Sequence, residues 1–415
     1  MNFLYNLLIS AFNALLPIIG LISPKLTLFA KGRRTVFEVL AKSINKEDKV
    51  IWFHCASLGE YEQGVPVMEE VKKKYPTHIL LVTFFSPSGY EVKKNSTLAD
   101  VIVYLPIDTK ANASRFVKLV NPQLAIFVKY EFWPNYLKKL KSNDIPIAII
   151  SATFRKDQAF FKWYGGFMRS ALKTVDHFFV QDTTSQQLLN QVGFDNVTIS
   201  GDTRFDRVSH QIEMDNQVDF ISEFIGDRLC IVIGSSWSED EEVFIDFVNQ
   251  ASDDLCFIIA PHEIKENGVQ ALKKKLKHKT VLFSEKEGKK MSEYKVFIMN
   301  TIGYLSRVYS YGDIAYVGGA MGTSGLHNIL EPATFGIPII IGKNFEKFRE
   351  AKQLQKLAGL FSVANATEFT NILNKLIDNK KFRQQTGMIS GHFINSNTGA
   401  TNRIVKYLIE KIDKF

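Results

Sequence analysis

A carboxylate follows the first strongly apolar run of the sequence, at a point where a strand should give way to a helix. In FHCASLGEYEQG, residues 53–64, the chain turns through Ser57 and Gly59 and reaches Glu60. In a helix-start interpretation, Ser57 caps the helix and Glu60 favours the positive end of its dipole by about 1 kcal/mol or less. Because ligands bind at the carboxyl ends of strands in open parallel sheets, Glu60 is also a candidate catalytic base. Taken alone, the stretch favours the helix-start interpretation.

A second acid follows another apolar run of the same half. KYEFWPNYL, residues 129–137, comes after a predicted strand and contains Glu131. Trp133 and Pro134 could simply pack at the start of the next helix. Glu131 would lie at a strand's carboxyl end in the same domain as Glu60, and two acids at two strand ends indicate a polyhydroxylated acceptor.

Gly-rich turns follow several strands of the second half. IVIGSSWSEDEE places Ser235 and Ser236 at a strand end, and YVGGAMGTSGLHNILEP places four glycines between a strand and a helix. Backbone N–H groups at such turns, with a helix dipole behind them, can bind a phosphate. Neither stretch is a Walker A loop or a strict GxGxxG, so a purely structural glycine turn explains the spacing equally well.

The second of these stretches also carries an amide and an acid at helical spacing. Asn328 and Glu331 share a helix face, where they could bind a ribose hydroxyl and a phosphate or base edge. Capping by Asn328 beside a solvated Glu331 is the alternative.

Metal and triad chemistry find little support in the sequence. The eight histidines are scattered, with no two at i, i+4, and no Asp-x-Asp occurs. No GxSxG elbow precedes a helix, and Ser235 has no evident histidine partner. We therefore expect no metal in the site and no cofactor.

Short β-branched or aromatic runs alternate with polar segments of helical length from residue 49 onward, which predicts parallel α/β architecture. The polar stretch 207–228 interrupts this rhythm, so we expect a tandem of two domains. The expected division is an apolar and basic anchor (1–34), a first domain (35–208), a linker (209–227), a second domain (228–398) and a last helix (399–415) that could return to the first domain. The expected strands are KVIWFHC, HILLVTFF, DVIVYLP, QLAIFVKY, IPIAIIS, DHFFVQD and NVTIS, then LCIVIGSS, DLCFIIAPH, TVLFS, KVFIMN, DIAYVGG, IPIIIG and LFSVA.

Composition fits a folded protein of 415 residues, 46% of them hydrophobic, that binds anions. The formal charge of +8 favours anionic partners, but the basic residues are not interleaved with aromatics, so we expect no nucleic acid. The three cysteines are far apart and set in apolar runs, which indicates a reducing compartment rather than a disulfide framework.

The amino terminus is apolar for most of its first 24 residues and then basic, with Lys25, Lys31, Arg33 and Arg34 before any acid. A secretory signal would place charge before the apolar core. Because two asparagines, a proline and a glycine interrupt the run, we favour a helical anchor on a membrane surface, with the basic cluster on the anionic cytoplasmic leaflet. A helix buried in the first domain and a transmembrane span are the alternatives.

A series of short motifs runs along nearly the whole chain, in the order HCASLGE, FSPSG, YEFWPN, ISGDTRFD, GSSWSEDEE, APHE, NTIGYL and VGGAMGTSGLHNILEPATFGIP. Together they resemble the Kdo transferases of lipid A biosynthesis, where Kdo is 3-deoxy-D-manno-octulosonic acid. The resemblance implies two Rossmann-like domains facing a cleft (the GT-B fold) with an N-terminal membrane-associating helix. It also implies an inverting, metal-independent glycosyltransferase that moves Kdo from CMP-Kdo to a lipid A precursor at the cytoplasmic face of the inner membrane.

The resemblance also implies residue roles. Glu60 matches the acid of the family's SxGE motif, which is the proposed general base. The resemblance therefore favours the catalytic interpretation of Glu60 over the helix-start interpretation. The first domain would bind the acceptor and the second the donor. The implied acceptor-side residues are Gly59, Ser86, Ser88 and Glu131, and the implied donor-side residues are Ser235, Ser236, His262, Gly303, Gly318, Gly319, Gly325, Asn328, Leu330 and Glu331.

Three positions depart from the family pattern. APHE lacks the arginine that usually precedes the histidine, which shifts phosphate contacts from His262 toward other basic residues such as Lys343. GLHN replaces GGHN, and YEF replaces a TEL-like sequence. None of these changes removes Glu60.

Two other functions fit the same residues less fully. One is a different GT-B enzyme, a UDP-sugar transferase or epimerase, which would bind UDP in place of CMP. The other is a noncatalytic membrane-bound lipid- or nucleotide-binding protein, which would bind both ligands without turnover.

Overall fold

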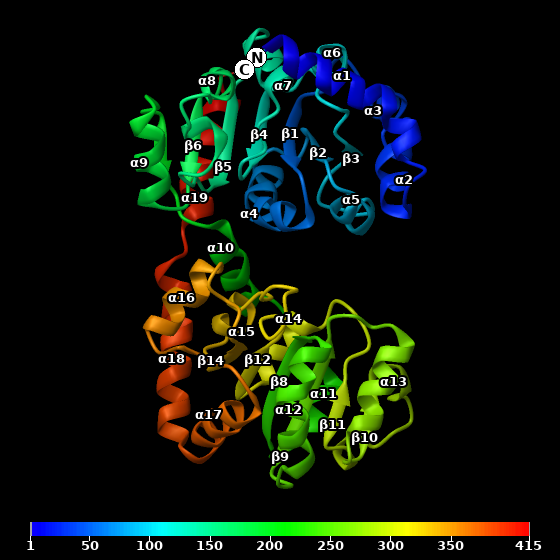
Figure 1. Cartoon of the computed structure of the whole chain (residues 1–415), viewed down its shortest axis with the longest axis vertical. Coiled ribbons are helices and arrows are strands. Elements are labelled where there is room, and N and C mark those ends of the chain that lie inside the picture. The colour runs from blue at the N-terminus through cyan, green and yellow to red at the C-terminus, as the bar shows by residue number, and fades with distance from the viewer. Residues whose placement is uncertain (1, 415) are drawn as a thin grey trace. The chain divides into compact units, whose positions relative to one another are not determined.

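The computed structural model describes residues 2–414 and divides into two compact units. Unit 1 comprises Met1–Arg207 with Thr398–Phe415, and unit 2 comprises Val208–Asn397. Each unit contains a seven-stranded sheet with labelled helices around it (Figure 1). The two sheets confirm the expected α/β fold, and every run expected as a strand forms one.

The sheet of unit 1 has the order β3-β2-β1-β4-β5-β6-β7, and its pairs are parallel. The central strands β1 and β4 are fully buried, as expected for parallel strands covered on both faces, whereas the edge strand β7 is half-buried. The strands are β1 (Val50–Cys55), β2 (Ile79–Phe84), β3 (Val101–Tyr104), β4 (Leu124–Val128), β5 (Ile147–Ala152), β6 (His177–Val180) and β7 (Val197–Ile199).

Helices cover the two faces of this sheet because alternate residues of β1 point to opposite sides. Val50 and Trp52 enter a core shared with α3, α6, α7 and α8, whereas Ile51 and Phe53 enter one shared with α4 and α19. The helices of unit 1 are α1 (Asn2–Ile19), α2 (Pro24–Lys31), α3 (Val36–Ser43), α4 (Leu58–Lys74), α5 (Pro87–Lys93), α6 (Lys110–Val120), α7 (Pro134–Lys141), α8 (Gly166–Leu172), α9 (Thr183–Gln191) and α19 (Ala400–Ile412), with the 3-10 turn η1 (Ala159–Phe161).

The sheet of unit 2 has the order β10-β11-β9-β8-β12-β13-β14, again parallel. Its strands are β8 (Leu229–Ser236), β9 (Leu255–Pro261), β10 (Thr280–Leu282), β11 (Val296–Ile298), β12 (Ile314–Val317), β13 (Ile339–Gly342) and β14 (Leu360–Val363). Its helices are α11 (Asp219–Ile225), α12 (Ser238–Gln250), α13 (Glu266–Lys275), α14 (Leu305–Val308), α15 (Leu330–Thr334), α16 (Arg349–Lys356), α17 (Ala366–Asp378) and α18 (Lys380–Ser396), with 3-10 turns η2 (Gln211–Glu213), η3 (Phe283–Glu285), η4 (Met291–Glu293) and η5 (Tyr309–Tyr311).

The segment expected as a linker, 209–227, is partly built into unit 2. Helix α10 (Thr203–His210) crosses the boundary between the units, and α11 buries Ile221 and Phe224 in the core beneath β8 and β9. The apolar spacing within this stretch is therefore a packing signal.

The last helix, α19, belongs to unit 1, where Ile404 and Leu408 are fully buried. Asp206 fixes its start, because its carboxylate accepts hydrogen bonds from the Gly399 and Thr401 backbone N–H groups at 2.5 and 2.8 Å. The chain thus returns to the first unit after completing the second.

Helix α1 has two different faces. Tyr5, Asn6 and Leu16 face the protein and are buried or half-buried, while the opposite face is apolar and exposed. Within residues 2–414, α1 is the one helix long and apolar enough to span a membrane, with mean hydropathy 1.5. The exposed large side chains of this helix and the turn after it are Phe3, Leu4, Leu7, Leu8, Leu15, Ile18, Leu21 and Ile22.

Candidate functional site

The sequence-predicted residues of unit 1 follow three adjacent strands. In the sheet order, β1 lies between β2 and β4, and Glu60, Ser86 and Glu131 follow β1, β2 and β4 respectively. The chain progresses toward one edge from β1 to β2 and toward the other from β4 onward. This reversal is the switch point at which open α/β sheets bind ligands.

Glu60 is held by the turn that precedes α4. Its Oε2 accepts hydrogen bonds from the Ser57 backbone N–H at 2.7 Å and from the Ser57 hydroxyl at 2.8 Å. The side chain is 6% exposed. The carboxylate therefore helps to begin the helix, as expected from helix chemistry, and the two donors stabilise its charge and fix its position.

The loop after β2 lies directly against this turn. The Ser86 backbone N–H donates to the Ala56 carbonyl oxygen at 2.7 Å, and the Ser86 and Ser88 hydroxyls lie 2.8 Å apart in an exposed position. Gly89 completes the close approach, since a Cβ there would lie 2.9 Å from the Leu58 backbone nitrogen. Beside it, a Cβ at Gly59 would meet no atom within 4 Å, so the start of α4 is open on this side.

Glu131 lies close enough to Glu60 for their charges to interact. Burial, and then the negative charge of Glu60, raise the pKa of Glu131 to about 7. The positive charge of Lys129 opposes this rise without cancelling it. Unit 1 thus places an anchored carboxylate beside a carboxyl group that titrates near neutral pH, an arrangement typical of proton-transfer sites.

A buried hydrogen-bonded chain holds the indole of Trp133. Its Nε1 donates to His54 Nε2 at 3.0 Å, so the His54 proton is on Nδ1, which donates to the Thr83 hydroxyl at 2.8 Å. Trp52 Nε1 donates to the same hydroxyl at 2.8 Å. Burial lowers the pKa of His54 to about 3, so its imidazole is neutral. It holds Trp133, and thereby the segment 129–133 that contains Glu131, which we call the Glu131 segment.

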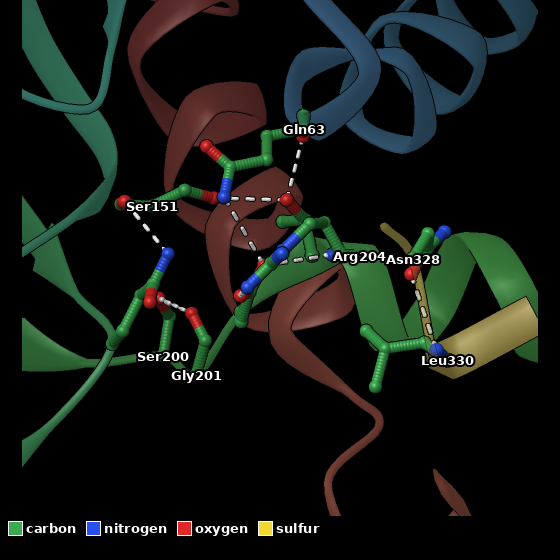
Figure 2. A network of polar contacts seen from close by, with 10 residues as sticks. Gln63, Ser151, Ser200, Gly201, Arg204, Asn328 and Leu330 are labelled. Carbon is green, nitrogen blue, oxygen red and sulfur yellow. Dashed lines mark hydrogen bonds and ion pairs between the residues drawn. The ribbon is translucent and has the colours of Figure 1, made fainter. Parts of the chain in front are cut away.

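A second buried network joins the ISGDTRFD motif to α4 (Figure 2). The Thr203 hydroxyl donates to the Gln63 carbonyl oxygen at 2.6 Å and lies 2.9 Å from the Ser151 hydroxyl. The Asp202 carboxylate accepts a hydrogen bond from Gln63 Nε2 at 3.4 Å and forms an ion pair with Arg204 at 2.7 Å. Because Gln63 lies one helical turn after Glu60, this motif braces the helix that carries the acid.

Several of the residues predicted for donor binding in unit 2 follow strands around a second switch point, between β8 and β12. The Gly318 N–H donates to the Gly234 carbonyl oxygen at 2.9 Å, and the His262 N–H donates to the Ser236 carbonyl oxygen at 2.9 Å. These bonds bring the turns after β8, β9 and β12 together. The Ser236 hydroxyl is buried without a hydrogen-bond partner among the described residues, so it remains available for a ligand.

Asp240 ties the turns after β8 and β12 to each other. Its carboxylate is fully buried and accepts from the Trp237 N–H at 2.8 Å, the Gly319 N–H at 2.9 Å and the Tyr316 hydroxyl at 2.7 Å. Asp240 occupies the same place in α12 that Glu60 occupies in α4, three residues after the cap. Asp240 is enclosed by protein donors, whereas the turn of Glu60 has open space beside it.

Gly319 permits this close packing. Its φ is 92°, which favours glycine, and a Cβ there would lie 2.1 Å from the Gly325 carbonyl oxygen. Any side chain would therefore displace the turn that contains Gly325.

Three aromatic rings stack beside these turns. Trp237 lies over His262 with ring centroids 4.5 Å apart, and His262 lies 4.3 Å from His327. Trp237 Nε1 donates to His327 Nε2 at 3.0 Å, so His327 carries its proton on Nδ1. Burial, and then the charge of His262, lower the pKa of His327 to about 4.

The remaining predicted donor residues form a separate local group. Asn328 Nδ2 donates to Glu331 Oε1 at 3.0 Å. Asn328 Oδ1 accepts from the Leu330 N–H at 3.1 Å, a bond drawn in Figure 2. The bond from Leu330 closes a turn just before α15, whose cap position is Ile329 and has no side-chain capping bond. Gly303 lies on the loop after β11, with φ of 89°, and Lys343 is exposed at the end of β13.

Sequence reasoning missed several residues that position the site. Asp240 and Trp237 lie within GSSWSEDEE, and Gln63 pairs with the ISGDTRFD motif, but only long-range contacts reveal what they do. An acid three residues after a helix cap was the one available signal for Asp240. Within residues 2–414, no group of three or more His, Cys, Asp or Glu side chains is arranged to hold a metal ion.

Comparison with known proteins shows which proteins this chain is similar to. The family model for 3-deoxy-D-manno-octulosonic-acid transferase (kdotransferase) matches residues 31–207. The 3-deoxy-D-manno-octulosonic acid transferase of Haemophilus influenzae is 27% identical over 374 residues, which cover 86% of this chain and 86% of the relative. That of Aquifex aeolicus is 28% identical over 359 residues, covering 83% and 92%.

Among solved structures, the UDP-GlcNAc 2-epimerase of Neisseria meningitidis bound to UDP-GlcNAc superposes with a TM-score of 0.62 over 87% of this chain and 100% of that chain. At 15% identity this likeness shows the two-domain fold alone. The sequence similarity to the transferases, in contrast, extends over most of the chain. Residues 31–207 therefore match the Kdo transferase domain, and the similarity of the chain to Kdo transferases over most of its length indicates a glycosyltransferase that transfers Kdo.

Proposed function

We propose that this protein transfers Kdo from CMP-Kdo to a lipid A precursor, with inversion and without a metal ion, at the cytoplasmic face of the inner membrane. The observation that carries the proposal is the pair of carboxyl groups at the switch point of unit 1, Glu60 and Glu131, one anchored by Ser57 and one with a pKa near 7. Such a pair suits proton removal from a sugar hydroxyl.

Glu60 is the general base of this mechanism. Its Oε2 is held by two donors, which fixes the carboxylate in place to receive a proton from a glucosamine hydroxyl of the acceptor. As that proton leaves, the hydroxyl oxygen forms a bond to the anomeric carbon of Kdo. The bond from that carbon to the CMP phosphate oxygen breaks on the opposite face, and CMP leaves with the electron pair.

Glu131 binds the acceptor beside the base. A carboxyl group with a pKa of about 7 exists in both protonation states at neutral pH, so it can donate or accept a hydrogen bond to an acceptor hydroxyl. Because its charge interacts with that of Glu60, the protonation states of the two carboxyl groups are coupled.

Unit 2 binds the donor through its strand-end turns. The start of α12 and the unpartnered Ser236 hydroxyl provide donors for the phosphate and the nucleotide, and the turn of Gly318 and Gly319 is held beside them by its bonds to Gly234 and Asp240. His327 presents its Nδ1 proton beside them as a neutral donor. These groups would stabilise the departing CMP, which is the role a metal ion has in other transferases.

The outward face of α1 is the membrane-binding surface. Its exposed Leu and Phe side chains would enter the lipid headgroup region, and the neighbouring Lys25, Lys31 and Arg34 would contact anionic phosphates. The positive formal charge of the chain also suits an acceptor that carries phosphates.

Incubation of the purified protein with CMP-Kdo and a lipid A precursor, followed by mass spectrometry of the lipid, tests the proposal. We expect a product heavier by one or more Kdo units. In parallel, CMP should raise the unfolding temperature more than UDP does, since binding to the native state stabilises it. No transfer, or protection by UDP alone, would favour the UDP-sugar enzyme that shares this fold.

A further inference from the structure

The helix that follows the Glu131 segment begins without a cap of its own. Trp133 occupies the cap position of α7 and makes no side-chain capping bond, and Pro134 has no N–H to offer. The backbone N–H groups of Asn135 and Tyr136 therefore need acceptors from elsewhere in the fold.

Asp108, on the loop between β3 and α6, supplies these acceptors. Its Oδ2 accepts from the Asn135 N–H at 3.1 Å and its Oδ1 from the Tyr136 N–H at 3.0 Å. Its backbone carbonyl oxygen accepts from Asn135 Nδ2 at 2.5 Å. Asp108 is 1% exposed, so these bonds are shielded from water.

The amino-terminal helix α1 bonds to this same cluster. The Tyr5 hydroxyl donates to Asp108 Oδ2 at 2.6 Å, and Asn6 Oδ1 accepts from Asn135 Nδ2 at 2.9 Å. Leu16 of α1 packs with Ala30 and Ile107, the residue before Asp108. The inner face of α1 is thus attached to the loop and helix start that adjoin the Glu131 segment.

We infer that α1 is a working part of the acceptor site, and that Tyr5, Asn6 and Asp108 are positioning residues that set the start of α7 and so the placement of Glu131. This inference rests on the acceptor role proposed for Glu131. It assigns α1 two separable functions: the outer face binds lipid, and the inner face orders the site.

The inner-face bonds also determine how α1 meets a membrane. A helix that crossed the bilayer would have to leave Asp108 and Asn135. The buried Asp108 carboxylate would then lose its hydrogen bond from Tyr5 without gaining one from water, which destabilises the fold. With these bonds intact, α1 lies along the surface of unit 1 with its apolar face outward, as an in-plane helix does.

The test compares Tyr5→Phe with Ser10→Ala. Both variants remove one hydroxyl from α1, but Ser10 is exposed and its hydroxyl is not among the groups that bond to Asp108 or Asn135. With acceptor presented in detergent micelles, we expect Tyr5→Phe to lower kcat/KM for the acceptor by about 3–10-fold, with donor Kd and membrane partitioning unchanged. Ser10→Ala should behave as wild type. Wild-type kcat/KM in Tyr5→Phe would overturn the inference.

Asp108→Asn and Asn6→Asp extend the comparison. Three groups donate hydrogen bonds to the Asp108 carboxylate: the Tyr5 hydroxyl and the backbone N–H groups of Asn135 and Tyr136. In Asp108→Asn, the side-chain NH₂ would face one of these donors, so we expect acceptor kcat/KM to fall by about 10–100-fold. Asn6→Asp keeps the oxygen that Asn135 needs and should retain most activity. An equal loss for the acceptor and the donor in Asp108→Asn would indicate general unfolding and overturn a positioning role.

Hydrogen exchange separates this inference from the proposed function. In Tyr5→Phe, the amides of 135–141 should exchange several-fold faster than in wild type, whereas Ser10→Ala should not change them. This readout needs neither CMP-Kdo nor the lipid. Absence of Kdo transfer in the wild-type protein would refute the proposed function, while unchanged exchange in Tyr5→Phe would refute the coupling of α1 to α7.

Discussion

Glu131→Gln should stabilise the protein at alkaline pH while it removes acceptor turnover. The pKa of Glu131 is raised from 4.5 to about 7, chiefly by burial and then by the charge of Glu60. A carboxyl group whose pKa is higher in the folded state holds its proton more tightly when folded. The stability of the neutral form is therefore fully present below pH 4.5 and is lost as pH rises through about 7.

The size of the effect follows from these two pKa values. Each pH unit between them is worth about 1.4 kcal/mol, so the raised pKa of Glu131 costs the folded state about 3 kcal/mol at pH 8 and about 1 kcal/mol at pH 5. Partial exposure of the side chain reduces both figures, and we expect a gain of about 2 kcal/mol for Glu131→Gln at pH 8. Glutamine is neutral at every pH and similar in shape, so the variant removes this cost.

Urea unfolding at pH 5 and pH 8, followed by tryptophan fluorescence, measures the difference. Trp237→Phe in every sample leaves Trp52, Trp133 and Trp163, all in unit 1, as reporters. Glu47→Gln, at an exposed carboxylate, is the matched control and should change little at either pH. Equal stability changes at both pH values, or no gain at pH 8, would refute the conclusion that burial in the site raises the pKa of Glu131.

Three further predictions concern the base, the metal and the anchor. Glu60→Gln should lower turnover by about 10²–10⁴-fold with CMP-Kdo affinity nearly unchanged, and wild-type turnover at saturating substrates would end the catalytic role of Glu60. EDTA should leave activity intact, and loss of activity that Mg²⁺ restores would contradict the metal-free phosphate site. Deletion of 1–24 should give a more soluble protein that still binds the donor but works poorly on lipid-embedded acceptor, and unchanged membrane partitioning would disprove the anchor. The deletion should also lower activity on micellar acceptor, because it removes the Tyr5 and Asn6 contacts.

The sequence was sufficient for the secondary structure and the order of the elements. Parallel strands buried on both faces read as continuous apolar runs, and Val50–Cys55 and Leu124–Val128 were evident for that reason. The acids Glu60 and Glu131 stood out because polar residues directly after such runs mark strand ends. The motif order then indicated the family, which the comparisons confirm.

Tertiary structure alone decided which distant residues meet and how their chemistry changes. Sequence periodicity reports only the faces of single elements, so it could not show that Asp240 reaches Gly319 or that Tyr5 reaches Asp108, 103 residues away. It could not show that Glu131 is buried near Glu60, and the pKa of a carboxyl group depends on that burial and that charge. Tertiary contacts also decided which way the apolar face of α1 points. The sequence determined that the helix is apolar, whereas packing of Leu16 and the bonds of Tyr5 and Asn6 determined that its apolar face points outward.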